Sequence, residues 1–252
     1  MCVTAHFIDD TWILHKKLIS FIPITSHRGE YLAKALENSL IDWGIRNVFS
    51  IIVDNASSND TAIGYFKKKM LSWGASSIRL KFLHMRCLAH ILNLVVNDGL
   101  KEINVSIKKV REAIRYIRNS PARLSKFREI YDLIGVELKC SLYLDVPTRW
   151  NSTYIMLKTV CLFKKTFNKY KEIGSSLISY LGDDILAFCD WECIRQMVDM
   201  LKVFYEITVK ISCSNYVITN SFFSEISDLN YIINDWQSSS ELSVYNMAIN
   251  MK

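Results

Sequence analysis

One aspartate directly follows the most hydrophobic run of the chain, in a position suited to a metal ligand. Asp54 comes after the apolar run at 48–53, which has the character of a strand buried in a sheet. The loop at 55–60 adds side-chain oxygens, and open α/β sheets bind ligands at the carboxyl ends of their strands. A hard divalent cation would suit this loop. The loop is equally typical of a helix cap with Ser58 or Asn59 as the capping residue.

A cysteine and two histidines form a second cluster. His84, Cys87 and His90 are three residues apart, so Cys87 and His90 share one face of a helix that begins near Arg86. The spacing would suit half of a zinc site, but no second Cys/His pair follows at finger spacing, which disfavours zinc. Two interpretations stay open. Either the pair projects toward the loop of Asp54, or Cys87 is a buried thiol beside a hydrogen-bonded histidine.

The segment 101–128 is strongly basic, with nine Lys and Arg against two Glu. Its helical periodicity separates a basic face from an apolar one. The basic face comprises Lys108, Arg111, Arg115 and Arg118, and the apolar face comprises Ile107, Val110, Ile114 and Ile117. The apolar face is expected to pack in a core. The basic face is either an ordinary solvated surface or a contact for the phosphates of a nucleic acid.

The segment 144–154 places an arginine beside a tryptophan after a proline-containing turn. Arg149 and Trp150 precede Asn151 and Ser152, either of which could cap the next helix. An arginine and a tryptophan together can hold a phosphate and stack on an unstacked base. In the alternative interpretation, Trp150 belongs to the core and Arg149 lies over it.

The elements that must position these residues are predicted by apolar periodicity. The first part reads as a hairpin over 1–24, a helix over 30–43, a strand over 48–53, a helix over 61–73 and a strand over 78–83. The remainder reads as helices near 86–101, 103–118, 121–134, 150–171, 188–213, 220–236 and 241–251. The predicted fold class is therefore α/β plus all-α.

The composition excludes several classes of protein for this chain. The 252 residues are 50% hydrophobic and 22% charged, with only 8 Gly and 3 Pro, which excludes a disordered or collagen-like chain. With no apolar run of about 18 uncharged residues and no signal-peptide pattern, we expect an intracellular protein without membrane contact. The seven cysteines lack a CxxC motif, so a disulfide framework is disfavoured and most cysteines are expected to be reduced thiols in the core. Residues 1–150 carry 22 Lys and Arg against 14 Asp and Glu, which would suit a polyanionic partner.

Four segments together resemble a known family. They are HRGEYLAKALENSLIDWGI, VFSIIVDNASSND, MRCLAHILNLVVNDGL and DVPTRWNSTYIMLK. In order and spacing they resemble the plant hAT (Ac-like) transposases and their RICESLEEPER-like relatives with a zinc finger BED domain. The resemblance extends over essentially the whole chain.

The resemblance implies an RNase H-like sheet, similar to that of retroviral integrases. In such enzymes two Asp and one Glu hold two divalent ions, Mg²⁺ or Mn²⁺, for DNA strand cleavage and transfer. The resemblance matches Asp54 to the second Asp and places Cys87 and His90 near the active site, where they are expected to be DNA-binding residues. It also assigns Arg149 and Trp150 to a DNA hairpin or a flipped base. It implies DNA as the partner and the nucleus as the location.

The first Asp and the Glu of that family have no counterpart within the 252 residues, and no BED zinc finger is present. We therefore expect residues 1–100 to form an incomplete RNase H-like sheet that lacks its first catalytic strand. Residues 101–252 are expected to form the mostly helical insertion region. The hairpin and the strand at 48–53 would then lose their common neighbour. Their edges would pair directly, accept another chain or stay exposed.

The function expected from these features is that of a transposase-derived, DNA-associated protein that is not an enzyme as it stands. Asp54 would be a vestigial catalytic and metal-binding residue, and no metal cofactor would be needed. DNA binding would be weak and non-specific, and the chain could form oligomers with copies of itself or with full-length relatives. Two other interpretations stay open. One is a fragment of an active hAT DNA transposase, and the other is a protein-interaction remnant without a DNA role.

Overall fold

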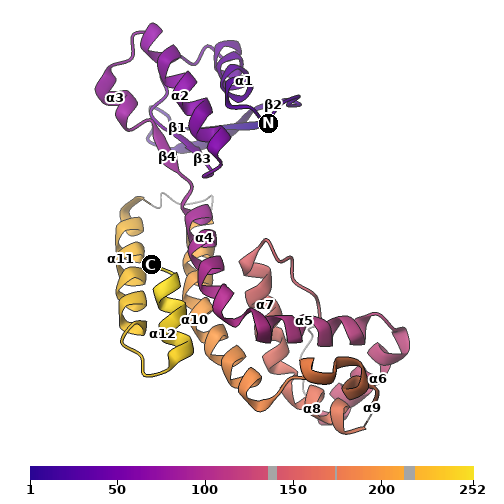
Figure 1. The fold of residues 1–252 in the computed structure, drawn as a ribbon. Coiled ribbons are helices and arrows are strands. Elements are labelled where there is room, and N and C mark those ends of the chain that lie inside the picture. The colour runs from indigo at the N-terminus through magenta and orange to yellow at the C-terminus, as the bar shows by residue number, and fades with distance from the viewer. Residues whose placement is uncertain (136–140, 174, 213–218) are drawn as a thin grey trace. The chain divides into compact units, whose positions relative to one another are not determined.

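The computed structural model describes residues 1–135, 141–173, 175–212 and 219–252 (Figure 1). These residues form two compact units, Met1–Ile91 and Leu92–Lys252, and the division falls within one helix, α4 (Leu88–Leu100). The sequence-based division between residues 100 and 101 lies at the end of that helix. The first unit combines helices and short strands, whereas the second is helical, in agreement with the predicted class of α/β plus all-α.

The first unit contains two separate two-stranded sheets. Its elements are β1 (Cys2–Ile8), β2 (Leu14–Phe21), α1 (Gly29–Asp42), β3 (Ile51–Val53), α2 (Ser57–Ser72), α3 (Ser77–Lys81) and β4 (His84–Arg86). The hairpin of β1 and β2 is antiparallel, as predicted, and β3 pairs with β4 in parallel. The direct pairing of the hairpin with β3, one of the expected outcomes for the open edges, does not occur.

Three elements in this unit differ from the prediction, and the first is β3, which covers only Ile51–Val53 of the strand expected at 48–53. The expected strand at 78–83 is wrong, because most of this run forms the helix α3 and the strand comes after it as β4. The side chain of Ser76 caps α3 by accepting a hydrogen bond from the Arg79 amide at 3.3 Å, which favours a helical turn over an extended chain. Helix α2 begins at Ser57, four residues before the expected start.

The core of the first unit forms where α1, α2 and α3 meet the strands. One hydrophobic cluster has five buried members, Leu40, Phe66, Met70, Leu80 and Leu83, and Ile19 and Ile51 are among the side chains that pack against them. Helices α1 and α2 approach closely at Gly29, where a β-carbon would lie 2.6 Å from Cβ of Thr61. Only glycine fits at this crossing without a shift of the backbone.

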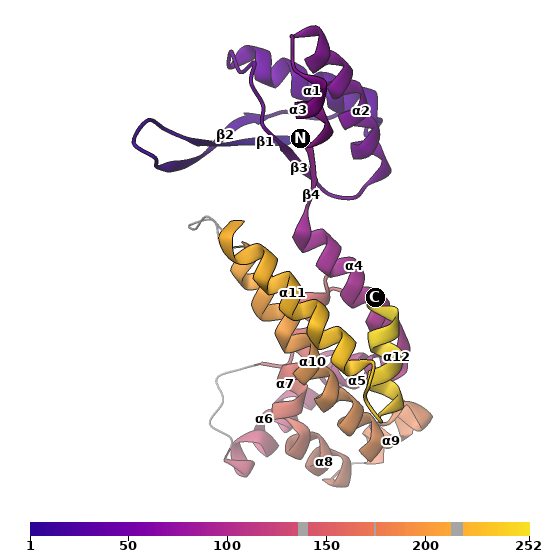
Figure 2. The ribbon, with the colours of Figure 1, turned by 90° about the vertical axis from the view of Figure 1, so that its left-hand side faces the viewer.

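The second unit is built from helices, among which α7 and α10 are close neighbours (Figure 2). After α4 it contains α5 (Asn104–Arg118), α6 (Pro121–Ile134), α7 (Trp150–Leu162), α8 (Lys164–Ile173), α9 (Ser175–Leu181), α10 (Phe188–Ser212), α11 (Thr219–Trp236) and α12 (Leu242–Asn250). Short 3₁₀ turns at Lys101–Ile103 and Gly182–Asp184 join some of them. The expected helix at 150–171 is divided in two at Phe163, and α9 was not predicted.

Buried apolar side chains hold this unit together, and one buried carboxylate joins two of its helices. Leu157 of α7 and Phe204 of α10 are fully buried. Asp190 of α10 accepts hydrogen bonds from Ser106 of α5 at 2.8 Å and from Lys109 at 2.9 Å. Hydrogen-bonded partners of this kind are what a buried carboxylate needs.

Two general expectations concern the membrane and the thiols. Within the described ranges, no helix has the length and apolar character needed to cross a membrane. The described cysteines form no disulfide, namely Cys2, Cys87, Cys161, Cys189 and Cys193. Cys2 and Cys189 are exposed and the other three are half-buried, so the expected location in the core is wrong for these residues. Cys140 and Cys213 lie outside the described residues.

Candidate nucleic-acid interface

Asp54 lies directly after β3, and its carboxylate closes the turn that leads into α2. Its Oδ1 accepts hydrogen bonds from the Ala56 amide at 3.0 Å and from Nδ2 of Asn59 at 2.6 Å. The polar loop therefore has the structural role of starting a helix. The capping residue is Ala56, with no side-chain capping bond, so the expected cap at Ser58 or Asn59 is wrong.

The Cys87–His90 pair begins at the same edge of the parallel strands as Asp54. The Cys87 amide donates to the carbonyl of Val53 at 2.9 Å, so Asp54 and Cys87 follow neighbouring strand ends. Both Cys87 and His90 are half-buried. Nδ1 of His84 lies 3.6 Å from Oδ1 of Asp60, and the structure shows no hydrogen-bond partner for the buried Nε2 of His84 among the described residues.

This edge does not fit a two-ion metal site. In the described part of the chain, no group of three or more His, Cys, Asp or Glu is placed to hold a metal ion. Oδ1 of Asp54 is already used by two hydrogen bonds within its own turn. Two divalent ions need several carboxylate ligands, and the described residues bring no such group together at this edge.

Helix α5 is amphipathic as predicted. Its apolar face is buried, including Ile107, Val110, Ile114 and Ile117. Three of the four residues of the predicted basic face are exposed: Lys108, Arg115 and Arg118. Lys108 lies 3.5 Å from a carboxylate oxygen of Asp184, and Arg115 pairs with Glu112 on its own helix. Within the described ranges, Arg118 has no acidic partner.

The fourth basic residue, Arg111, does not belong to the exposed face. Its side chain is only 17% exposed, and the side chain of Asp145, which it contacts, is 1% exposed. Nε and Nη2 of Arg111 donate to the two carboxylate oxygens of Asp145 at 2.9 and 2.6 Å. The helical period correctly places Arg111 on the same face of α5 as the other basic residues. The carboxylate of Asp145, which comes from a later loop, pairs with its guanidinium. In this conformation Arg111 is not available to DNA.

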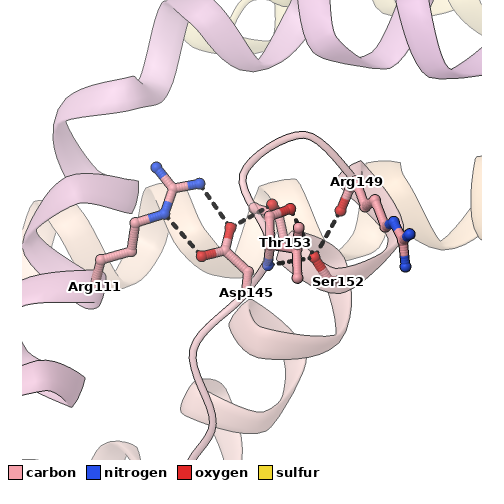
Figure 3. Close-up of polar contacts among 6 residues, drawn as sticks. Arg111, Asp145, Arg149, Ser152 and Thr153 are labelled. Atoms are coloured by element: carbon pink, nitrogen blue, oxygen red, sulfur yellow. Dashed lines mark hydrogen bonds and ion pairs between the residues drawn. The ribbon is translucent and has the colours of Figure 1, made fainter. Parts of the chain in front are cut away.

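Asp145 links α5 to the first turn of α7 (Figure 3). Its Oδ2 also accepts a hydrogen bond from Oγ1 of Thr153 at 2.6 Å. Burial by itself raises the pKa of Asp145, but the hydrogen bonds from Arg111 and Thr153 outweigh this effect, so the pKa lies below its ordinary value. The carboxylate is thus ionised and used on both oxygens.

Bonds within the segment 146–152 shape the turn that carries Arg149. The Arg149 amide donates to the carbonyl of Val146 at 2.8 Å, and the Val146 amide donates to Oγ of Ser152 at 2.8 Å. The hydroxyl of Ser152 also lies 2.7 Å from the carbonyl of Arg149. In Figure 3 the guanidinium of Arg149 points away from Asp145. It is exposed, and the described residues offer it no acidic partner.

Trp150 is buried, whereas the neighbouring Arg149 is exposed. Its side chain is 2% exposed, and its ring packs edge-to-face on Phe204 of α10 with centroids 6.4 Å apart. The structure thus agrees with the core interpretation of Trp150, and the expected contact with a flipped base would need a different conformation. Of the predicted pair, only Arg149 is presented to solvent.

Asp145 and Thr153 were missed because the sequence offers little sign of their role. Asp145 stands between Leu144 and Val146, and an acidic residue in an apolar run is a hint of a buried, paired carboxylate. The identity of its partner, 34 positions earlier, has no local signature.

Two family models match most of the chain. The ZBED1 RNase-like domain matches residues 1–78, and the ZBED1 RNase-like helical domain matches residues 85–200. The two matches follow the change from the α/β unit to the helical unit. They support an RNase-like fold in the broad sense, with its helical part after residue 85.

Known proteins from plants and a fungus are similar over the full length of this chain. The Putative AC transposase of Zea mays is 28% identical over 258 residues, which cover 100% of this chain and 31% of that protein. The zinc finger BED domain-containing protein RICESLEEPER 3 of Oryza sativa subsp. japonica is 30% identical over 247 residues, covering 96% and 31%. The Putative transcriptional regulator tpeD of Talaromyces stipitatus is 27% identical over 276 residues, covering 97% and 31%.

The chain spans about a third of the length of these relatives. Their names describe transposases, zinc finger BED domain-containing proteins and a transcriptional regulator, so the chain is related to transposases and to transposase-derived proteins. Together with the family models, these similarities show that the homologues of this chain, along essentially its whole length, are Ac-like transposases and RICESLEEPER zinc finger BED domain-containing proteins.

Proposed function

We propose that this chain is a transposase-derived module that binds the phosphates of DNA weakly and without sequence preference. The contacts would come from Arg149 together with the exposed cations of α5, Lys108, Arg115 and Arg118. The observation that carries the proposal is Arg149, an exposed guanidinium on a turn held by the first residues of α7. Such a group is free to pair with a phosphate oxygen, for which its planar fork is well shaped.

The weak, sequence-tolerant character follows from the type of contact. Phosphates are the same along any DNA, so cations that contact them carry no base information. With Trp150 buried, no aromatic side chain that could stack on a base is left in the proposed contact set. The names of the relatives, transposases and a transcriptional regulator, support DNA as the partner and the nucleus as the location.

We also propose that the chain by itself does not cut DNA. One carboxylate, Asp54, stands where the family's second Asp is matched, and it closes a turn. Strand cleavage by two divalent ions requires a shared set of ligands. We therefore treat Asp54 as vestigial in this chain and propose no metal cofactor for it.

A second candidate is supported by the similarity to the Putative AC transposase along the whole chain. In this case the 252 residues would be part of an active DNA transposase, in which other segments supply the missing ligands. This candidate predicts metal-dependent nicking of DNA, whereas the first predicts none.

Binding to fluorescently labelled duplexes of two unrelated sequences tests the proposal. We expect the full chain to bind both with similar affinity and Arg149→Ala to weaken both equally. The matched control is Arg195→Ala, because this exposed arginine is held by Glu192 and Asp199 on α10. Equal affinity of wild type and Arg149→Ala would overturn the proposed role of Arg149.

A further inference from the structure

We infer that Arg111, Asp145 and Thr153 are positioning residues, which hold the Arg149 turn in the geometry that contacts a DNA phosphate. The inference rests on the proposed function, and it gives Arg111 a role different from direct contact with DNA. The three side chains come from α5, from the loop before α7 and from the first turn of α7 (Figure 3).

We call the cluster of Arg111, Asp145 and Thr153 the brace. It contains two separate contacts to the Asp145 carboxylate. The first contact is made by Arg111, which donates hydrogen bonds to both oxygens of Asp145 at 2.9 and 2.6 Å. The other is the Thr153 hydroxyl, 2.6 Å from Oδ2 of the same carboxylate. Arg111 is 17% exposed and Asp145 1%, so little water competes with these bonds. A planar guanidinium on a carboxylate fixes orientation as well as distance.

The Arg149 turn depends on the brace at its beginning. The hydrogen bonds of the turn mostly join residues within 146–152 to each other. Asp145 is the residue directly before this segment, and it ties the segment to α5. Helix α7 itself is held separately, through buried side chains such as Trp150 and Leu157. Loss of the brace should therefore loosen the turn while α7 keeps its packing.

Charge alone and positioning make opposite predictions for Asp145. The carboxylate is negative, so its removal by Asp145→Asn would strengthen DNA binding if only net charge mattered. If Asp145 positions the turn, its removal weakens the contribution of Arg149, because a disordered arginine must be ordered on binding. The two explanations are thus separated by the effect of Arg149→Ala in the Asp145→Asn background, which is lost if Asp145 positions the turn and retained if only net charge matters.

The test is a double-mutant cycle, measured by DNA binding of the full chain. Arg149→Ala is expected to weaken binding about threefold to fivefold in the wild-type background, the scale of one exposed ion contact. In the Thr153→Val and Asp145→Asn backgrounds the same change should have almost no effect. Arg118→Ala, whose residue lies outside the brace, should weaken binding equally in every background.

Thr153→Val keeps the Arg111–Asp145 pair, so it is the variant that preserves the fold if Asp145→Asn does not. Its helical content and thermal midpoint are measured alongside, and Thr153→Ser, which retains the hydroxyl, should restore the effect of Arg149→Ala. An equal effect of Arg149→Ala in all backgrounds would overturn the positioning role and leave the proposed function intact. No effect of Arg149→Ala in the wild type would overturn both.

Discussion

Arg111 and Asp145 lie 34 positions apart in the sequence, and two hydrogen bonds join their side chains. The contact ties the basic helix α5 to the loop that carries Arg149. It also removes one of four cations from the basic face that periodicity predicts on α5. Because of this buried pair, Arg111 has a structural role, whereas Arg149 stays exposed.

Removal of one member of this pair should destabilise the helical unit. Asp145→Ala leaves the Arg111 guanidinium without its carboxylate in a site that excludes most water. We expect a loss of about 3–5 kcal/mol in the free energy of unfolding, the usual result of leaving a buried charge unpaired. Urea unfolding followed by circular dichroism measures it.

The matched control is the exposed Arg195, held by Glu192 and Asp199 on its own helix, whose change to Ala should alter stability by less than about 0.5 kcal/mol. A double variant, Arg111→Met with Asp145→Leu, should be more stable than Asp145→Ala, because no unpaired charge remains. A loss no larger for Asp145→Ala than for Arg195→Ala would contradict the role of the pair.

The same carboxylate predicts how stability depends on pH. Although burial raises the pKa of Asp145, hydrogen bonds from Arg111 and Thr153 bring it below its ordinary value of 3.8. Folding therefore favours the ionised form. Its stabilising contribution is complete above the unfolded-state pKa and is lost as the pH falls through the lower folded-state pKa.

Urea midpoints measured over the acid range should thus fall below about pH 4 in the wild type. Asp190 titrates in the same sense, because burial raises its pKa but hydrogen bonds from the Ala187 amide, Lys109 and Ser106 lower it further. Asp145→Asn should therefore make the acid decline shallower without abolishing it. A decline of identical steepness in both proteins would exclude Asp145 as a cause.

The tip of the β1–β2 hairpin makes an independent stability prediction. Trp12 adopts the left-handed region with φ of 64° and is 87% exposed. Glycine adopts this conformation without strain, whereas a residue with a β-carbon loses roughly 1 kcal/mol. Trp12→Gly should therefore keep or raise the thermal midpoint of the first unit. Trp12→Ala, which retains the strain, should leave it unchanged, and a large loss with Trp12→Gly would show that the indole stabilises the tip.

The local elements were largely predictable from the sequence. Helix α5 and the β1–β2 hairpin depend on periodicity and turn residues that stand next to each other in the chain. The run at 78–83 was misassigned because its apolar residues also fit a strand, and the cap at Ser76 decides for a helix. Short apolar runs are ambiguous for this reason.

The candidate site was predictable only in part, because its key contacts are long-range. Arg149 was identified from its own segment, but burial of Trp150 depends on Phe204, which lies on another helix. Similarly, the availability of Arg111 depends on Asp145, and no local pattern places that carboxylate opposite α5. The type of each residue indicates what chemistry its side chain can do. Whether that side chain is exposed depends on how the helices pack, which the sequence does not show locally.

Asp54 provides the test between the two candidate functions. Purified chain incubated with supercoiled or hairpin-ended DNA and Mg²⁺ or Mn²⁺ should produce no metal-dependent nicking, because one carboxylate cannot position two ions. Asp54→Ala serves as the matched variant and should behave like the wild type. Nicking that requires the metal and disappears in Asp54→Ala would favour the second candidate, an active transposase part.

The salt dependence of DNA binding tests the central claim most directly. Each phosphate contact that releases counterions contributes roughly −0.9 to the slope of log affinity against log salt concentration. The full chain should show a linear slope, and the double variant Arg118→Ala with Arg149→Ala should reduce its magnitude by about 1.8, while Arg195→Ala leaves it unchanged. Unaltered affinity and slope in the double variant would contradict phosphate binding through these arginines.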